Sequence, residues 1–131
     1  MLGRDANPTI RSGKVAVESI VVPSRTVLLW PVMAFGAMKV TYFNVIHKIC
    51  RQVGANFDNV KAGAFLTGYI EKQHTLVPGP DGKFGFGGKC FPENVSAMGE
   101  HLRKIGMVNE SELFTFMSLL NLEYRHLKGA G

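Results

Sequence analysis

A glycine-rich run in the second half of the chain contains the residues best suited to chemistry. It reads Gly-Phe-Gly-Gly-Lys-Cys-Phe over residues 85–91 and places Cys90 directly before a predicted helix. Glycine lets a backbone approach a ligand closely, and the free N–H groups and dipole at a helix start favour a thiolate. These features are typical of a nucleophilic cysteine. A free cysteine is also often a small core residue, so a structural role for Cys90 is the alternative.

Basic side chains lie near this run in the sequence. His74, Lys83 and Lys89 could add positive charge beside the thiol, or the two lysines could face a phosphate. Solvated loop lysines explain them equally well. The four histidines are scattered along the chain, so no metal site is predicted.

A long helix is the main element predicted to position the loop. Between residues 32 and 53, apolar residues recur at spacings of three and four, and Gly54 would end the helix. Pro31 either begins this helix or kinks one that starts near Ser24. The predicted apolar face consists of Val32, Phe35, Met38, Tyr42, Val45, Ile46, Ile49, Cys50 and Val53.

Three shorter helices are predicted after it. They cover residues 56–66, residues 92–104 and a segment that begins near Asn109, where Glu112 would complete a capping arrangement. The apolar face of the last helix would consist of Leu113, Phe116, Met117, Leu120 and Tyr124. Residues 14–22 are rich in valine and predict a strand or an extended arm. The predicted class is all-α with a possible N-terminal strand or arm.

Composition favours a single soluble domain. The 131 residues, 46% of them hydrophobic, suffice for a core, and the +5 net charge is spread without basic runs. We therefore expect no nucleic-acid partner, although a small anionic ligand is compatible with the charge. The two cysteines are far apart, residues 1–13 lack the apolar core of a signal peptide, and no stretch approaches about 20 apolar residues. We expect a cytoplasmic protein with no membrane partner.

Three collinear segments resemble one known family. The run Pro78-Gly-Pro-Asp-Gly-Lys-Phe-Gly-Phe-Gly-Gly-Lys-Cys-Phe-Pro-Glu-Asn94 resembles the cysteine segment of the UDP-glucose/GDP-mannose dehydrogenase family. Residues 39–54 are similar to the distal part of that family's long central helix, and residues 121–125 resemble its Asn-x-x-x-Arg ending. The resemblance covers about residues 34–125, which correspond to the central domain alone.

The resemblance implies a fold, a site and a partner. The fold would be a long central helix with shorter helices packed on it, like the C-terminal domain of 6-phosphogluconate dehydrogenase. Residues 26–131 would form a helical dimerisation domain after an extension of uncertain structure at residues 1–25, and the long helix would pair in a homodimer. Cys90 would be the nucleophile, and the residues predicted to bind a nucleotide-sugar are Phe84, Gly85, Phe86, Gly87, Gly88 and Lys89.

Several positions depart from the family pattern. Asn94 stands where the family has an aspartate, and an amide cannot exchange protons as a carboxylate does. The helix lysine and asparagine of the family align with about Leu29 and Met33, and the Asp-x-Arg-Ile segment falls on residues 67–70, Thr-Gly-Tyr-Ile. Neither apolar residue can stabilise an oxyanion. These departures argue against dehydrogenase activity.

Two classes of function compete for this sequence, and a third possibility is binding of a nucleotide-sugar or phosphate through the glycine loop without turnover. The first is a stand-alone, non-catalytic oligomerisation or binding module that binds no cofactor by itself. The alternative is one piece of a split dehydrogenase that oxidises a sugar 6-alcohol to the acid through Cys90. NAD would then require a separate Rossmann-domain polypeptide, because Gly85, Gly87 and Gly88 do not form the Gly-x-Gly-x-x-Gly turn between a strand and a helix.

Overall fold

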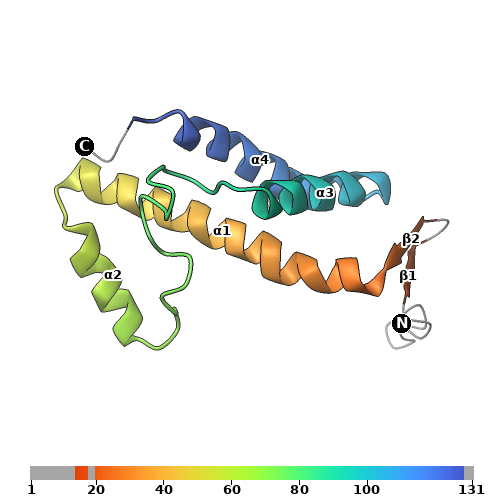
Figure 1. Cartoon of the computed structure of the whole chain (residues 1–131), viewed down its shortest axis with the longest axis horizontal. Helices are drawn as coiled ribbons and strands as arrows, with labels where there is room; N and C mark the ends of the chain where they lie inside the picture. The colour runs from red at the N-terminus through yellow and green to blue at the C-terminus, as the bar shows by residue number, and fades with distance from the viewer. Residues whose placement is uncertain (1–13, 18–19, 129–131) are drawn as a thin grey trace.

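The computed structural model describes residues 14–17 and 20–128, with side chains from residue 27 onward. Its longest element is helix α1, Ser24–Val53, followed by α2, Phe57–Leu66, α3, Cys90–Lys104, and α4, Val108–Arg125. In Figure 1, α3 and α4 lie together along one side of α1, and α2 projects from the end of α1 on the other side. The predicted all-α class is confirmed, while the likeness to 6-phosphogluconate dehydrogenase stays a prediction.

A short antiparallel hairpin precedes α1. Strand β1, Lys14–Val17, pairs with β2, Ile20–Pro23, so that Val15 lies opposite Val22. The valine-rich segment predicted as a single strand or arm therefore contains two strands that pair with each other. The predicted boundary between an extension and a helical domain falls close to the start of α1 at Ser24.

Helix α1 settles the two alternatives for Pro31. The helix starts at Ser24 and contains Pro31 within it, so the proline does not begin the helix. At the other end, Gly54 takes a φ of +76°, a left-handed conformation that glycine adopts without a steric penalty. The predicted stop at Gly54 is confirmed.

The face of α1 that packs inside the chain carries small side chains. Ala34 and Ala37 are buried there against the core residues Phe86, Val95, Leu102, Phe114 and Met117. Small residues let α3, α4 and the glycine loop approach the α1 backbone closely. Most large apolar residues of the predicted stripe instead point outward, although Cys50 is buried. The exposed fractions of Val32, Phe35, Tyr42, Ile49 and Val53 are 49–70%.

Helix α4 corrects two sequence predictions. Met107 is the N-cap residue and no side chain caps the helix, so the predicted Asn109–Glu112 capping arrangement is wrong. Its buried face includes Phe114, Met117 and Tyr124, whereas Leu113 and Phe116 are more than half exposed. That face is the one that α3 covers, where Phe114 joins Val95 and Leu102 of α3 in the core.

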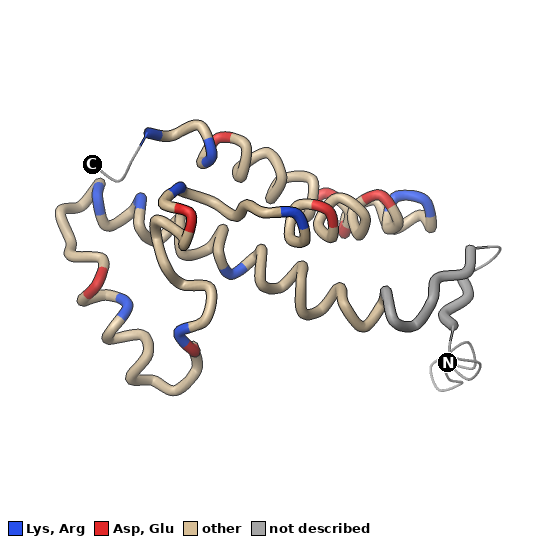
Figure 2. The backbone as a smooth tube through the Cα atoms, viewed as in Figure 1, with Lys and Arg blue, Asp and Glu red and all other residues tan. Residues whose placement is uncertain are grey.

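The distribution of charge separates α1 from the other helices. Figure 2 shows acidic and basic residues along α2, α3 and α4, while residues 27–53 of α1 carry only Lys39, Lys48 and Arg51. By length and composition alone, Val27–Val53 would suffice to cross a membrane, contrary to the expectation that no such stretch exists. Core helices of soluble proteins meet the same criterion, and α1 packs against α3 and α4.

A clamped glycine loop as the candidate functional site

The glycine loop leads into α3 and consists of an exposed turn followed by a buried segment. In the turn, the Gly79 N–H donates to the Lys83 carbonyl and the Gly82 N–H donates to the Gly79 carbonyl, both at 2.9 Å. The Val77–Pro78 peptide bond before it is cis. Residues 84–86 are then buried between α1 and α4. The backbone N–H and C=O groups of a buried segment need hydrogen-bond partners, which the neighbouring helices can supply.

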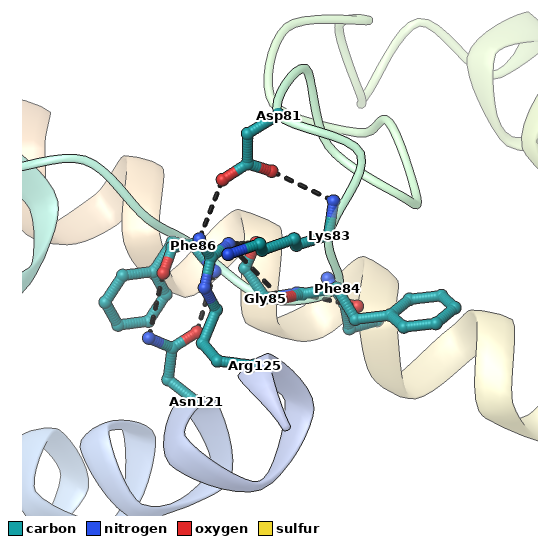
Figure 3. Close-up of polar contacts among 8 residues, drawn as sticks. Asp81, Lys83, Phe84, Gly85, Phe86, Asn121 and Arg125 are labelled. Atoms are coloured by element: carbon teal, nitrogen blue, oxygen red, sulfur yellow. Dashed lines mark hydrogen bonds and ion pairs between the residues drawn. The ribbon is translucent and has the colours of Figure 1, made fainter. Parts of the chain in front are cut away.

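Two asparagine side chains supply those partners. The Phe86 N–H donates to Asn121 Oδ1 at 2.7 Å, and Asn121 Nδ2 donates to the Phe86 carbonyl at 2.9 Å, as Figure 3 shows. From α1, Asn44 Oδ1 accepts the Gly85 N–H at 3.1 Å. We call Asn44, Asn121 and Arg125 the loop clamp, because together they hold the glycine loop to the two helices.

Arg125 joins the end of α4 to the exposed turn. Its Nη2 lies 2.7 Å from Asp81 Oδ2, and its Nη1 lies 3.4 and 3.5 Å from the Phe84 and Gly85 carbonyl oxygens. Asp81 Oδ1 also accepts the Lys83 N–H at 3.0 Å. The Arg125 hydrogen bond and then the Lys83 N–H hold the pKa of Asp81 below its ordinary value.

The clamp explains two of the glycines. Gly85 has a φ of +79°, and a Cβ there would collide with Asn121 Oδ1 and lie 3.1 Å from Tyr124 Cβ. A Cβ at Gly87 would lie 2.7 Å from the guanidinium carbon of Arg125. The sequence suggested that these glycines let a ligand approach. In the structure they first let α4 approach, and their predicted role in binding a ligand stays a prediction.

A cavity of about 350 Å³ borders the loop on the side of α1. Its walls include His74, Asp81 and Phe91 together with three of the six predicted binding residues, Gly85, Phe86 and Gly87. Phe84 turns elsewhere, with its ring 5.5 Å from that of His47, and Gly88 and Lys89 are exposed outside the cavity. The structure thus brings half of the predicted binding set to one cavity.

His74 is a cavity residue with an unusual backbone. It has a φ of +63°, a region that non-glycine residues seldom adopt, and its ring lies 5.2 Å from that of Phe91. From the sequence, His74 is expected only as a possible source of positive charge beside Cys90. Its position on the cavity wall depends on the loop path, which residue types alone do not reveal.

Cys90 is the first residue of α3, and its thiol is free and exposed. Asn94 lies one turn further along, and its Nδ2 donates to the Cys90 carbonyl at 2.8 Å. The two predicted catalytic positions are therefore adjacent, but Asn94 binds the helix backbone and provides no carboxylate. Cys90 itself does not border the cavity.

The glycine loop does not fit a dinucleotide cofactor. Such a site needs a strand that leads into the glycine turn, whereas the described residues before the loop are helix α2 and irregular chain. Gly85 and Gly87 also lie against α4 side chains and do not frame an open phosphate site.

His47 and His101 pack against aromatic side chains. His47 lies with its ring 5.0 Å from Phe57 and 5.5 Å from Phe84, and burial, then the charge of Arg51, lower its pKa. The His101 ring lies 5.3 Å from that of Trp30. Among the described residues, no three His, Cys, Asp or Glu side chains come together in a way that could hold a metal ion.

Comparison with known proteins decides the family. The model of the UDP-glucose/GDP-mannose dehydrogenase family, central domain, matches residues 32–121. The chain belongs to this family. The matched segment runs from α1 through the glycine loop into α4, so it contains both asparagines of the loop clamp, while Arg125 lies just beyond it.

Individual relatives of this dehydrogenase family are much longer than the chain. It is 43% identical to UDP-glucose 6-dehydrogenase of Rhizobium meliloti over 65 residues, which are 50% of the chain and 14% of that protein. It is 31% identical to UDP-glucose 6-dehydrogenase of Rickettsia felis over 91 residues, which are 70% of the chain and 19% of that protein. No solved structure matches the chain significantly.

Proposed function

We propose that this central domain is an assembly module that pairs with a second copy of itself through α1. The observation that carries the proposal is the outer face of α1. Leu28, Val32, Phe35, Lys39, Tyr42, Ile46, Ile49 and Val53 follow one another at spacings that alternate between four and three residues. This is the spacing of a seam along which two helices pack.

Exposure and charge support the same interface. Apart from Lys39 and the half-buried Ile46, the seam residues are large, apolar and about half or more exposed. Lys39 breaks the seam, but its ammonium donates to the Glu71 carbonyl at 2.6 Å and so has a partner within the chain. A twofold pair buries the same stripe on both copies, which would cover this face completely.

The test is the mass of the protein in solution. Sedimentation or light scattering of the whole chain at micromolar concentration is expected to give a dimer. Phe35→Glu, which places a charge in the middle of the seam, is expected to halve that mass. Leu119→Glu is the matched control, because Leu119 is 56% exposed on α4, outside the seam. A monomeric wild type at high micromolar concentration would contradict the proposal.

A second candidate is one piece of a split NAD-dependent nucleotide-sugar dehydrogenase. A second exposed apolar surface, on the outer side of α4, favours this candidate. It consists of four residues that are each 51–62% exposed: Leu113, Phe116, Leu119 and Leu122. One twofold contact through α1 leaves this surface uncovered, and a partner polypeptide could occupy it. The exposed Cys90 would then attack an aldehyde-level intermediate, while the partner would supply the cofactor.

This candidate is tested by reconstitution. The chain is mixed with an NAD-binding partner polypeptide and either UDP-glucose or GDP-mannose, and NADH formation is followed, with Cys90→Ala as the control. Activity that disappears in Cys90→Ala would establish the split enzyme. If every mixture is inactive although the partner binds, the assembly module is the better description. The substitution of Asn94 for the family's aspartate leads us to expect the second result.

A further inference from the structure

A second cavity, of about 340 Å³, lies between the C-terminal parts of α1 and α4, which end on the same side of the molecule (Figure 1). It shares no lining residue with the cavity that Asp81 and His74 border. Phe84 lines the second cavity and Phe86 lines the first, and their rings point in opposite directions from the loop in Figure 3. The glycine loop therefore separates two independent spaces, and the second is large enough for a small ligand.

The buried walls of the second cavity are aromatic. Phe84 and Tyr124 are only 4% and 3% exposed, and the ring of the half-buried His47 lies 5.5 Å from that of Phe84. Aromatic side chains of this kind pack favourably against another ring, edge to face or offset. The inner part of the cavity is therefore suited to a planar, apolar group.

The exposed wall of this cavity carries positive charge. Lys48 and Arg51 are exposed on successive turns of α1 and both line the opening. Lys48 lies 3.6 Å from the Glu123 carboxylate, whereas Arg51 has no ion-pair partner among the described residues. Burial and then the charge of Arg51 lower the pKa of His47, although Asp58 opposes them. The guanidinium of Arg51 is thus available to an anionic ligand.

Tyr124 contributes a hydroxyl to the same cavity. No hydrogen bond to a described residue engages this hydroxyl. Burial, and then the charge of Glu123, raise the pKa of Tyr124, so the hydroxyl stays protonated at neutral pH and can donate. A buried hydroxyl without a partner costs free energy, which a hydrogen bond to a ligand oxygen would recover.

We propose that this cavity binds a small aromatic carboxylate, with its ring against Phe84 and Tyr124 and its carboxylate on the Arg51 guanidinium and the Tyr124 hydroxyl. Guanidinium groups bind carboxylates through paired, charge-assisted hydrogen bonds. The site is independent of α1 pairing and of Cys90, because none of its lining residues belongs to the α1 seam and Cys90 does not border it.

The ligand class is tested by titrating the whole chain with benzoate, benzamide and acetate, followed by NMR of the His47 ring and the Gln52 side-chain amide, which both line the cavity. Benzoate is expected to shift both signals, and the other two compounds much less, because benzamide lacks the charge and acetate lacks the ring. Acetate or benzamide binding as tightly as benzoate would overturn the proposal, and so would the absence of any benzoate-induced shift.

Three variants test the residues of the site. Arg51→Gln is expected to weaken benzoate binding roughly tenfold, and Tyr124→Phe, which keeps the ring, roughly fivefold, the factors that a charged and a neutral hydrogen bond contribute. Lys104→Gln is the matched control, because it removes one positive charge from an exposed position on α3 outside the cavity. It is expected to leave binding unchanged.

Equal losses of affinity in Arg51→Gln and Lys104→Gln would indicate a net-charge effect and overturn the proposal. Unchanged binding in Tyr124→Phe would also overturn it, because the hydroxyl would then have no role. If Arg51→Gln fails to fold, the comparison of Tyr124→Phe with wild type decides the question.

Discussion

The two long faces of α1 differ in side-chain size and in what covers them. The inner face presents Ala34, Ala37, Thr41 and Asn44, all buried beneath α3, α4 and the glycine loop. The outer face presents larger residues such as Phe35 and no described segment covers most of it. Side-chain size therefore does not identify the buried face of α1, because the close approach of α3, α4 and the glycine loop requires small residues there.

The same contrast recurs on α4, where it offers the largest expected effect. Phe114→Ala should lower the free energy of unfolding by about 3–5 kcal/mol, because Phe114 is 7% exposed in the core. Phe116→Ala, on the bare side of the same helix, should change it by less than about 0.5 kcal/mol. Urea denaturation measures both. Equal losses would mean that the outer face of α4 is covered in solution, and the contrast between faces would fail.

Two glycines of the loop distinguish the cost of a left-handed backbone from the cost of a steric clash. Gly85 and Gly88 have nearly the same φ, +79° and +76°, but only Gly85 has α4 atoms where a Cβ would lie. Gly88→Ala should therefore cost about 1 kcal/mol from the left-handed backbone alone, and Gly85→Ala about 3 kcal/mol. Thermal denaturation of the two variants checks this. Similar losses of stability in the two variants would show that Asn121 and its neighbours on α4 move to accommodate a methyl group at residue 85.

Substitution of Asn121 measures how much the hydrogen bonds to the glycine loop contribute to stability. Asn121→Ala removes both partners of the Phe86 backbone and should cost about 2 kcal/mol. Asn121→Asp keeps an acceptor for the Phe86 N–H but cannot, when ionised, donate to its carbonyl, so its effect should be smaller. Hydrogen exchange at the Phe86 amide is the direct measurement. Unchanged protection in Asn121→Ala would contradict the clamp.

The smallest expected effect on the free energy of unfolding concerns Asp81, on the exposed turn of the glycine loop. Its pKa in the folded chain lies below the ordinary value of 3.8, so its contribution is fully present above that value and is lost as the pH falls through the lower, folded pKa. The side chain is largely exposed, which limits the contribution to less than about 1 kcal/mol. Urea denaturation of wild type and Asp81→Asn from pH 6 to pH 2 should converge at the acid end. Curves that stay parallel would exclude the ion pair as a source of stability.

Residue patterns were sufficient to predict the helices and the family, while the role of Cys90 stays a prediction. Apolar spacing predicted α1 and α4, and capping and proline signals predicted α2 and α3. Gly54 predicted the end of α1 because few other residues adopt its φ, and the run that includes Cys90 indicated the family. Periodicity failed at choosing which side of α4 is buried. A helix with apolar residues on several sides has no unique core face until its neighbours are placed, and Phe114 is buried because α3 packs against its side of α4.

Local residue preferences place a glycine loop with Cys90 between two helices, because glycine, proline and capping signals act over a few residues. The contacts of that loop depend on tertiary packing. Asn44 and Asn121 reach it across 41 and 35 residues of chain, and Arg125 reaches Asp81 across 44. Such contacts depend on how α1 and α4 pack, so the glycines that suggested a ligand are explained first by the α4 side chains that lie against them.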